Sequence, residues 1–167
     1  MRIVIGSDHR GVELKARLIP LLEQWGHTVI DRGVHTSQAV DYPDIAADVS
    51  QRVSRGEVDR GILICGTGIG MAITANKFPG VRAATCHDEF EAEMCRRHND
   101  VNVLCLSSHL LGERNLEKMI SLWLNTDFEG GRHARRIEKI SQLESQLCHN
   151  KASAATSDEQ HSCGGSC

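Results

Sequence analysis

Short apolar runs alternate with helix-like segments along most of this chain. Each run is rich in Val, Ile and Leu and is bounded by turn residues, which is typical of strands buried on both faces of a parallel sheet. We expect such strands near residues 2–6, 27–31, 61–65, 81–86 and 101–106. Helical patterns are expected near residues 11–25, 43–55, 69–77, 88–97, 112–125 and 133–148. The alternation predicts βαβ units, a parallel sheet and an α/β sandwich of three layers.

The length of the chain and a change in its composition predict one domain followed by a tail. A chain of 167 residues suits one domain with a sizeable core. From about Asn150 the sequence contains no large apolar residue, so it cannot offset the entropy lost on ordering. We therefore expect a single domain over residues 1–149 and a disordered tail over residues 150–167.

Composition excludes several classes of function. The formal net charge of −3 provides no basic field for nucleic acid, and no apolar run approaches the ~20 residues that span a membrane. The seven cysteines are an odd number without paired spacing, which predicts reduced thiols in a cytoplasmic protein. Neither these cysteines nor the nine histidines form a CxxC or HExxH pattern, so we expect no structural zinc site.

A cysteine at the end of the third predicted strand is the first candidate for chemistry. Residues 61–70 read Gly-Ile-Leu-Ile-Cys-Gly-Thr-Gly-Ile-Gly, which predicts a strand, a tight glycine turn and the start of a helix. Free backbone N–H groups at a helix start attract anions and favour the thiolate form of a neighbouring cysteine. Cys65 is thus placed where a thiolate could form beside an anionic ligand. The segment equally suits a buried strand-end cysteine beside a turn.

A second candidate segment, Asp8-His9, directly follows the first predicted strand. In an open α/β sheet, ligands bind beyond the carboxyl ends of the strands, where the strand order reverses. If the first and third strands are neighbours, this loop and the Cys65 turn share one crevice. Taken singly, Asp8 also suits a helix N-cap, and His9 suits a solvated loop.

Further polar residues suit either a ligand or a simpler structural role. Histidine suits acid–base chemistry near neutral pH, but His98-Asn99 also suits a helix C-terminus. Arg132 and Arg136 lie four residues apart on one predicted helical face, which suits phosphate oxygens or a solvated surface. Asp41 precedes a predicted helix, where it could contact ligand hydroxyls or only form the turn.

Taken together, these segments resemble the ribose-5-phosphate isomerase B family, which also includes allose- and galactose-6-phosphate isomerases. The matching stretches, in order along the chain, are Gly6-Ser7-Asp8-His9, Asp41-Tyr42-Pro43, residues 61–70, Ala75-Asn76-Lys77, Arg97-His98-Asn99-Asp100 and Glu129-Gly130-Gly131-Arg132-His133. The resemblance implies a Rossmann-like αβα fold with a five-stranded parallel sheet. It implies a homodimer, often paired into tetramers, with the site at the dimer interface. It also implies that no metal and no nucleotide cofactor take part.

The resemblance assigns the catalytic roles residue by residue. Cys65 resembles the base of the cysteine-type subgroup, because Ile69-Gly70-Met71 contains no acid that could replace it. His98 resembles the residue that opens the sugar ring, with Asp8 and Thr67 beside it.

Substrate-binding roles follow in the same way. The residues that resemble the phosphate ligands are His9, Arg132 and Arg136. The groups that resemble those holding an enediolate are Asn99 and the backbone of Gly66, Gly68, Ile69 and Gly70. We also expect Asp41 to bind the substrate, through its hydroxyls. His109 departs from the family pattern, since many relatives carry an arginine there, and the tail from about residue 150 has no counterpart.

These roles predict the interconversion of ribose 5-phosphate and ribulose 5-phosphate through a cis-enediolate. An isomerase of another sugar phosphate, such as allose 6-phosphate or a tetrose phosphate, is the first alternative. A nucleotide-binding protein is the second, with Asp88 contacting a ribose, but the glycines follow the third strand and lack G-x-G-x-x-G spacing. A catalytically silent sugar-phosphate binder is the third, which an intact Cys65 and His98 disfavour.

Overall fold

The computed structural model describes residues 1–109 and 115–160. The chain divides into two compact units, Met1–Glu129 and Gly130–Cys167, and each is described by itself. The predicted division into one domain over 1–149 and a tail stays a prediction.

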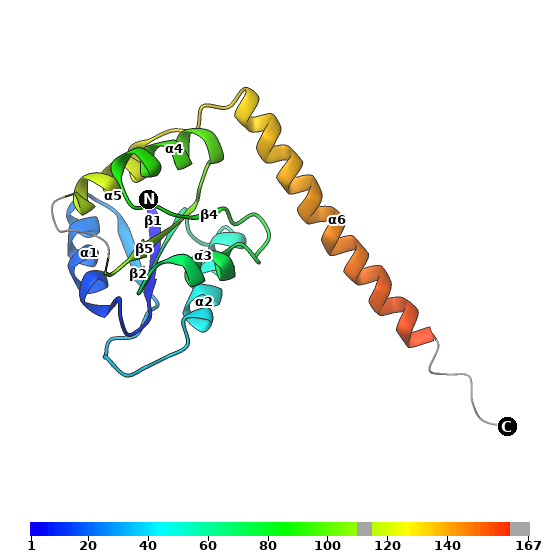
Figure 1. Cartoon of the computed structure of the whole chain (residues 1–167), viewed down its shortest axis with the longest axis horizontal. Helices are drawn as coiled ribbons and strands as arrows, with labels where there is room; N and C mark the ends of the chain where they lie inside the picture. Colours follow the sequence, from blue (N-terminus) through cyan, green and yellow to red (C-terminus); the bar gives the residue numbers. More distant parts are fainter. Residues whose placement is uncertain (110–114, 161–167) are drawn as a thin grey trace. The chain divides into compact units, whose positions relative to one another are not determined.

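Strands and helices alternate through the first unit, as the apolar runs predict (Figure 1). In chain order they are β1 (Arg2–Ser7), α1 (Val12–Gln24), β2 (Thr28–Asp31), α2 (Tyr42–Ser54), β3 (Arg60–Cys65), α3 (Ile69–Ala75), β4 (Ala83–Thr85), α4 (Glu89–Asn99), β5 (Val103–Ser107) and α5 (Leu116–Asn125). All strand pairs are parallel, and the five-stranded sheet has the order β2-β1-β3-β5-β4. The predicted α/β fold with a five-stranded parallel sheet is confirmed.

The strand order places the first and third strands side by side. β1 pairs with β3 in a register that sets Ser7 opposite Ile64. The chain moves to one side of β1 to form β2 and then crosses to the other side to form β3, so the strand order reverses here. The loops after β1 and β3 therefore open at one edge of the sheet, where α/β proteins bind ligands.

Side chains alternate between the two faces of the sheet and form a core on each. One face carries Ile5, Ile62 and Leu104 and packs against α1, α4 and α5. The other face carries Leu63 and Cys65 and packs against α2 and α3. The three-layer sandwich follows from this period-two alternation in strands that are buried on both sides.

Two strands are shorter than the apolar runs predict, because side-chain amides replace part of the ladder. The Asn102 Oδ1 accepts a hydrogen bond from the backbone of Arg82 at 2.8 Å, ahead of β5. The Asn76 side chain accepts from the backbone N–H of Ala83 and donates to its carbonyl oxygen, both at 2.9 Å. β4 and β5 consequently begin at Ala83 and Val103 rather than at 81 and 101.

The second unit consists, within the described residues, of one helix, α6 (Arg132–Gln160). It begins after Gly130 and Gly131, which have φ values of 69° and 54°. In the structure α6 continues through residues 150–160, a stretch with three alanines, which favour helices. The predicted disorder of the tail stays a prediction. Residues 161–167 lie outside the described part. No helix of the described residues is long and apolar enough to cross a membrane.

Candidate active site

The turn after β3 holds Cys65 with a backbone N–H directed at its sulfur. Cys65 is the last residue of β3 and is only 5% exposed. The N–H of Gly68 donates to the Cys65 Sγ at 3.1 Å. Gly68 has a φ of 77°, and a Cβ there would lie 3.0 Å from Thr85 Cγ2. This position thus needs glycine for both its left-handed backbone and its close packing.

Bonds from the end of β5 hold the glycine turn against the sheet. The Ser108 N–H donates to the carbonyl oxygen of Cys65 at 2.9 Å. The Ser107 hydroxyl donates to the carbonyl oxygen of Gly66 at 2.7 Å. Thr67 remains exposed at the tip, where its Oγ1 accepts from the N–H of Ile69 at 3.3 Å. The turn after β3 is therefore held to the end of β5 at Cys65 and Gly66, while Thr67 is exposed.

The loop after β1 lies next to this turn, as the strand order requires. The N–H of Asp8 donates to the carbonyl oxygen of Ile64, the residue before Cys65, at 3.1 Å. The Asp8 Oδ1 accepts from the N–H groups of Arg10 and Gly11 at 2.9 and 3.2 Å. Gly11 is the N-cap of α1 and has no side-chain cap, so Asp8 braces the turn before the helix instead of capping it. Its second oxygen, Oδ2, takes no part in these bonds.

An open hollow beside the loop contains two of the predicted binding residues. Its volume is about 500 Å³, and it is lined by His9, Ala39, Val40, Asp41 and Asp44. The Val40 N–H donates to the Nδ1 of His9 at 3.3 Å, which leaves the Nε2 as the protonated nitrogen of the neutral ring. A Cβ at Gly70 would lie 2.6 Å from the ring of Tyr42, the residue after Asp41. The hollow and the glycine turn are therefore neighbours.

His98 and Asn99 lie at the opposite edge of the sheet from Cys65. They are the last two residues of α4. Arg82, which directly precedes β4, donates from its guanidinium to the carbonyl oxygens of Asn99 and Asp100 at 3.1 and 2.9 Å, so the end of α4 lies beside the start of β4. Cys65 instead pairs with Ser107 at the carboxyl end of β5. A strand of five residues rises about 3.3 Å per residue, so roughly 15 Å separate these edges. The first unit of one chain does not bring His98 to Cys65.

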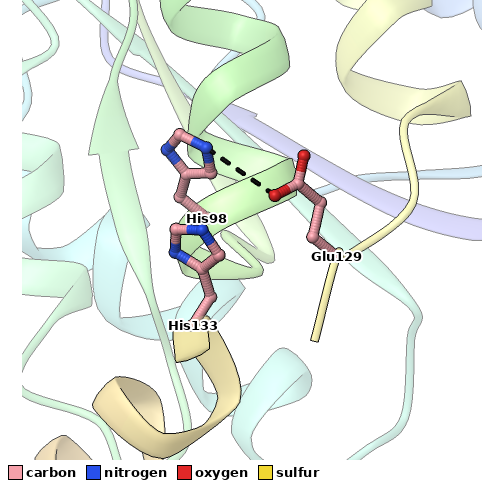
Figure 2. A group of neighbouring side chains, drawn as sticks. All are labelled: His98, Glu129 and His133. Atoms are coloured by element: carbon pink, nitrogen blue, oxygen red, sulfur yellow. Dashed lines mark ion pairs between the residues drawn. The ribbon is translucent and has the colours of Figure 1, made fainter. Parts of the chain in front are cut away.

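Glu129 lies beside His98 at this edge. Figure 2 shows the imidazole of His98 facing the carboxylate of Glu129. The His98 Nε2 lies 3.9 Å from the Glu129 Oε2. The guanidinium of Arg97 donates to Glu129 Oε1 at 2.6 Å, and this hydrogen bond raises the pKa of Arg97 above its ordinary value. The Glu129 N–H also donates to the carbonyl oxygen of Arg97 at 3.0 Å. The carboxylate is thus fixed in a position from which it can orient the imidazole.

The remaining predicted ligands, Arg132 and Arg136, lie on the first turns of α6 in the second unit, four residues apart. The Arg132 Nε and the His133 Nε2 are 3.2 Å apart. Their shared helical face matches the prediction, while their contact with a phosphate stays a prediction.

Sequence reasoning missed one residue near the glycine turn, Arg10, which lies beside the His109 that the sequence already singled out. The Arg10 Nη1 lies 3.5 Å from the Nε2 of His109. A Cβ at Gly66 would lie 3.2 Å from Arg10 Cδ and 3.7 Å from His109 Cδ2, so both side chains border the turn. Arg10 has no distinguishing pattern except its place directly after Asp8-His9. The guanidinium of Arg10 thus supplies a positive charge beside His109, the position at which many relatives carry an arginine.

Residues 3–140 match the model of a family described as ribose/galactose isomerase. The chain belongs to this family. The ribose-5-phosphate isomerase B of Escherichia coli is 44% identical over 86% of this chain and 96% of its own length. The D-erythrulose-4-phosphate isomerase of Pectobacterium atrosepticum is 40% identical over 89% of this chain and 99% of its own. The structure of ribose-5-phosphate isomerase B from Clostridium thermocellum superposes with a TM-score of 0.86 at 46% identity, covering 88% of this chain and 99% of that one.

Proposed function

We propose that this chain is an aldose–ketose isomerase that interconverts ribose 5-phosphate and ribulose 5-phosphate. One observation carries the proposal: a backbone N–H donates to a buried cysteine sulfur at the carboxyl end of β3, within a glycine turn at the point of strand reversal. Membership of the ribose/galactose isomerase family supports it. So does the similarity to the ribose-5-phosphate isomerase B of Escherichia coli.

Cys65 acts as the base that moves a proton between C1 and C2 of the sugar. Its thiolate takes the proton from one carbon and returns it to the neighbour, so that a cis-enediolate forms in between. The carbon acid is weak, and negative charge that develops on the sugar oxygens must be stabilised by prepositioned donors. Each such donor contributes roughly 2.7–4 kcal/mol. The backbone N–H groups of residues 66–70 can approach these oxygens because three of the five residues are glycines.

The cyclic sugar must open before isomerisation, and this step requires a second copy of the chain. His98 moves the proton between the ring oxygen and the hydroxyl, with Asp8 and Thr67 beside it. Because His98 lies at the far edge of its own sheet, the imidazole that reaches Cys65 comes from a partner, together with Asn99. Ile69, Ile73 and Phe90, on α3 and the first turn of α4, are exposed near the site and suit such a contact.

The phosphate serves as a handle that positions the reacting end. His9 lies in the hollow next to the glycine turn, and Arg132 and Arg136 supply guanidinium groups that suit phosphate oxygens. Binding energy from this remote group orients C1 and C2 at Cys65. The phosphate contact therefore selects substrate length, and Asp41 contacts the hydroxyls between the phosphate and the reacting carbons.

Comparison of three substrates tests the assignment of a pentose. We expect kcat/KM to be highest for ribose 5-phosphate and lower for allose 6-phosphate and erythrulose 4-phosphate. One carbon more or less displaces the reacting atoms by over an ångström, which can cost about a hundredfold in rate. A preference for the tetrose, the substrate named for the Pectobacterium relative, would replace the pentose and leave the isomerase chemistry intact. Absence of turnover on all three would reject the isomerase itself.

A further inference from the structure

Two buried cysteines outside the proposed site lie in contact where β4 leads into α4. Cys86 follows β4 directly and Cys95 lies in the second half of α4; they are 2% and 9% exposed. Their Sγ atoms are 3.7 Å apart, and the Cys86 S–H donates to the Cys95 sulfur. The Cys95 S–H donates to the carbonyl oxygen of Ala92 at 3.2 Å. Both are free thiols and take no part in the mechanism above.

The two sulfurs are already close enough for a disulfide to form after a small local shift. A disulfide has an S–S distance of about 2.05 Å, so the sulfurs must approach by roughly 1.7 Å. Cys86 is two residues before the N-cap Asp88, in the short connection that can supply this movement. The hydrogen bond from Cys86 lowers the pKa of Cys95, and the charge of Arg96 acts in the same direction. Cys95 is also the more exposed of the two, so it is the sulfur that reacts first.

We propose that Cys86 and Cys95 are a redox pair that a hydroperoxide oxidises reversibly to a disulfide, which slows the enzyme by displacing the end of β4. The Cys95 thiolate attacks one peroxide oxygen, the O–O bond breaks, and the leaving oxygen takes a proton to become an alcohol or water. Cys95 is then a sulfenic acid. The Cys86 sulfur, losing its proton, attacks it, the S–O bond breaks, and hydroxide leaves and is protonated to water. Two thiols are oxidised by two electrons while one peroxide is reduced.

Packing connects this pair to the glycine turn. Thr85, the residue before Cys86, points to the other face of the sheet, where a Cβ at Gly68 would lie 3.0 Å from its Cγ2. The Cys86 N–H donates to the carbonyl oxygen of Cys105 at 3.4 Å. The backbone carbon of Cys105 would in turn lie 3.3 Å from a Cβ at Gly68. Drawing Cys86 toward α4 therefore disturbs the packing behind Gly68, whose N–H is directed at Cys65.

Mass spectrometry tests bond formation without reference to activity. Wild-type protein is treated with hydrogen peroxide, quenched with catalase, denatured and alkylated with iodoacetamide. Trypsin then releases residues 83–96, which contain both cysteines. We expect this peptide to be two hydrogen atoms lighter and unalkylated until dithiothreitol is added. The Cys65→Ala variant must give the same result, and Cys95→Ala and Cys95→Ser must leave Cys86 open to alkylation. Two alkyl groups on the oxidised wild-type peptide would overturn the proposal.

Turnover tests the effect of the bond, which is the part that rests on the proposed function. We expect wild-type kcat to fall several-fold more than that of Cys95→Ala after the same peroxide treatment, and to recover with dithiothreitol. Equal losses in both proteins would assign the effect to Cys65 oxidation and reject the link to β4. Lack of turnover in the reduced wild type would instead refute the proposed function, and the mass measurement would still decide whether the disulfide forms.

Discussion

The proposed chemistry depends on the sulfur of Cys65 and on the backbone N–H of Gly68 that is directed at it. We predict that Cys65→Ala lowers kcat by at least the 10²–10⁴-fold that is typical of losing an acid–base group, because no acid follows in Ile69-Gly70-Met71. Binding of a phosphorylated sugar acid, measured by calorimetry, is expected to persist. Cys105→Ala is the matched control, since Cys105 is a buried cysteine of the neighbouring strand whose pKa is raised by desolvation. Near-normal turnover in Cys65→Ala would reject the thiolate base.

The arginines of α6 are expected to act in binding rather than in chemistry, because the phosphate does not change between ground and transition states. A charge-assisted hydrogen bond contributes roughly 1.5–3 kcal/mol. Arg136→Ala should therefore raise KM by about ten- to a hundredfold with little change in kcat. Arg55→Ala, at the C-cap of α2, provides a control for the loss of a surface arginine. A loss of kcat at unchanged affinity for a phosphorylated inhibitor would remove Arg136 from the phosphate site.

His27 makes the stability of the fold depend on pH. Burial lowers its pKa below the ordinary histidine value of 6.5, and the positive N-terminus acts in the same direction. A folded-state pKa below the unfolded one stabilises the fold above about pH 6.5, and this stability is lost as the pH falls through the folded pKa. Urea unfolding should thus show a larger drop between about pH 7 and pH 5 in the wild type than in His27→Gln. The same drop in both proteins would contradict this.

The glycine turn between β3 and α3 positions the N–H of Gly68 at the Cys65 sulfur. Gly68→Ala is expected to destabilise the protein by about 1–2 kcal/mol, the cost of a left-handed non-glycine residue, with a further cost from the contact at 3.0 Å with Thr85. Gly56 provides a matched control, with a φ of 68° and nothing within 4 Å of its Cβ position. Denaturant unfolding should therefore rank Gly68→Ala below Gly56→Ala. Equal losses would show that Thr85 moves away without cost.

The sequence predicts elements that depend on a local apolar pattern. It does not predict element boundaries that depend on side chains from elsewhere in the chain. The strands were predictable because strands buried on both faces need continuous apolar runs. The starts of β4 and β5 were not, because the amides of Asn76 and Asn102 bond to strand backbone from elsewhere in the chain. The loops that carry Asp8 and Cys65 lie next to each other because β1 and β3 pair, which the sequence left as a condition. Arg10 was missed, since an arginine in a loop has no periodicity that distinguishes it.

At the scale of the whole molecule, the direction of α4 separates the two halves of the proposed chemistry. A helix that follows a parallel strand runs back along the sheet, so its last residues lie beside the starts of the strands. His98 and Asn99 end α4, whereas Cys65 ends β3. If both act on one substrate, each site takes its sulfur from one chain and its imidazole from another. Two such sites per dimer then follow from a twofold axis.

Complementation between two inactive variants tests this shared site. Cys65→Ala and His98→Asn are each expected to be inactive alone. After the two proteins are mixed, unfolded and refolded together, half of the dimers pair one chain of each kind. One of the two sites in such a dimer combines the intact Cys65 with the intact His98, so turnover should return to about a quarter of the wild-type value per chain. Each variant refolded alone is the control and should stay inactive. If the mixture also stays inactive while size-exclusion chromatography and differently tagged chains demonstrate mixed dimers, His98 and Cys65 do not act across the two chains.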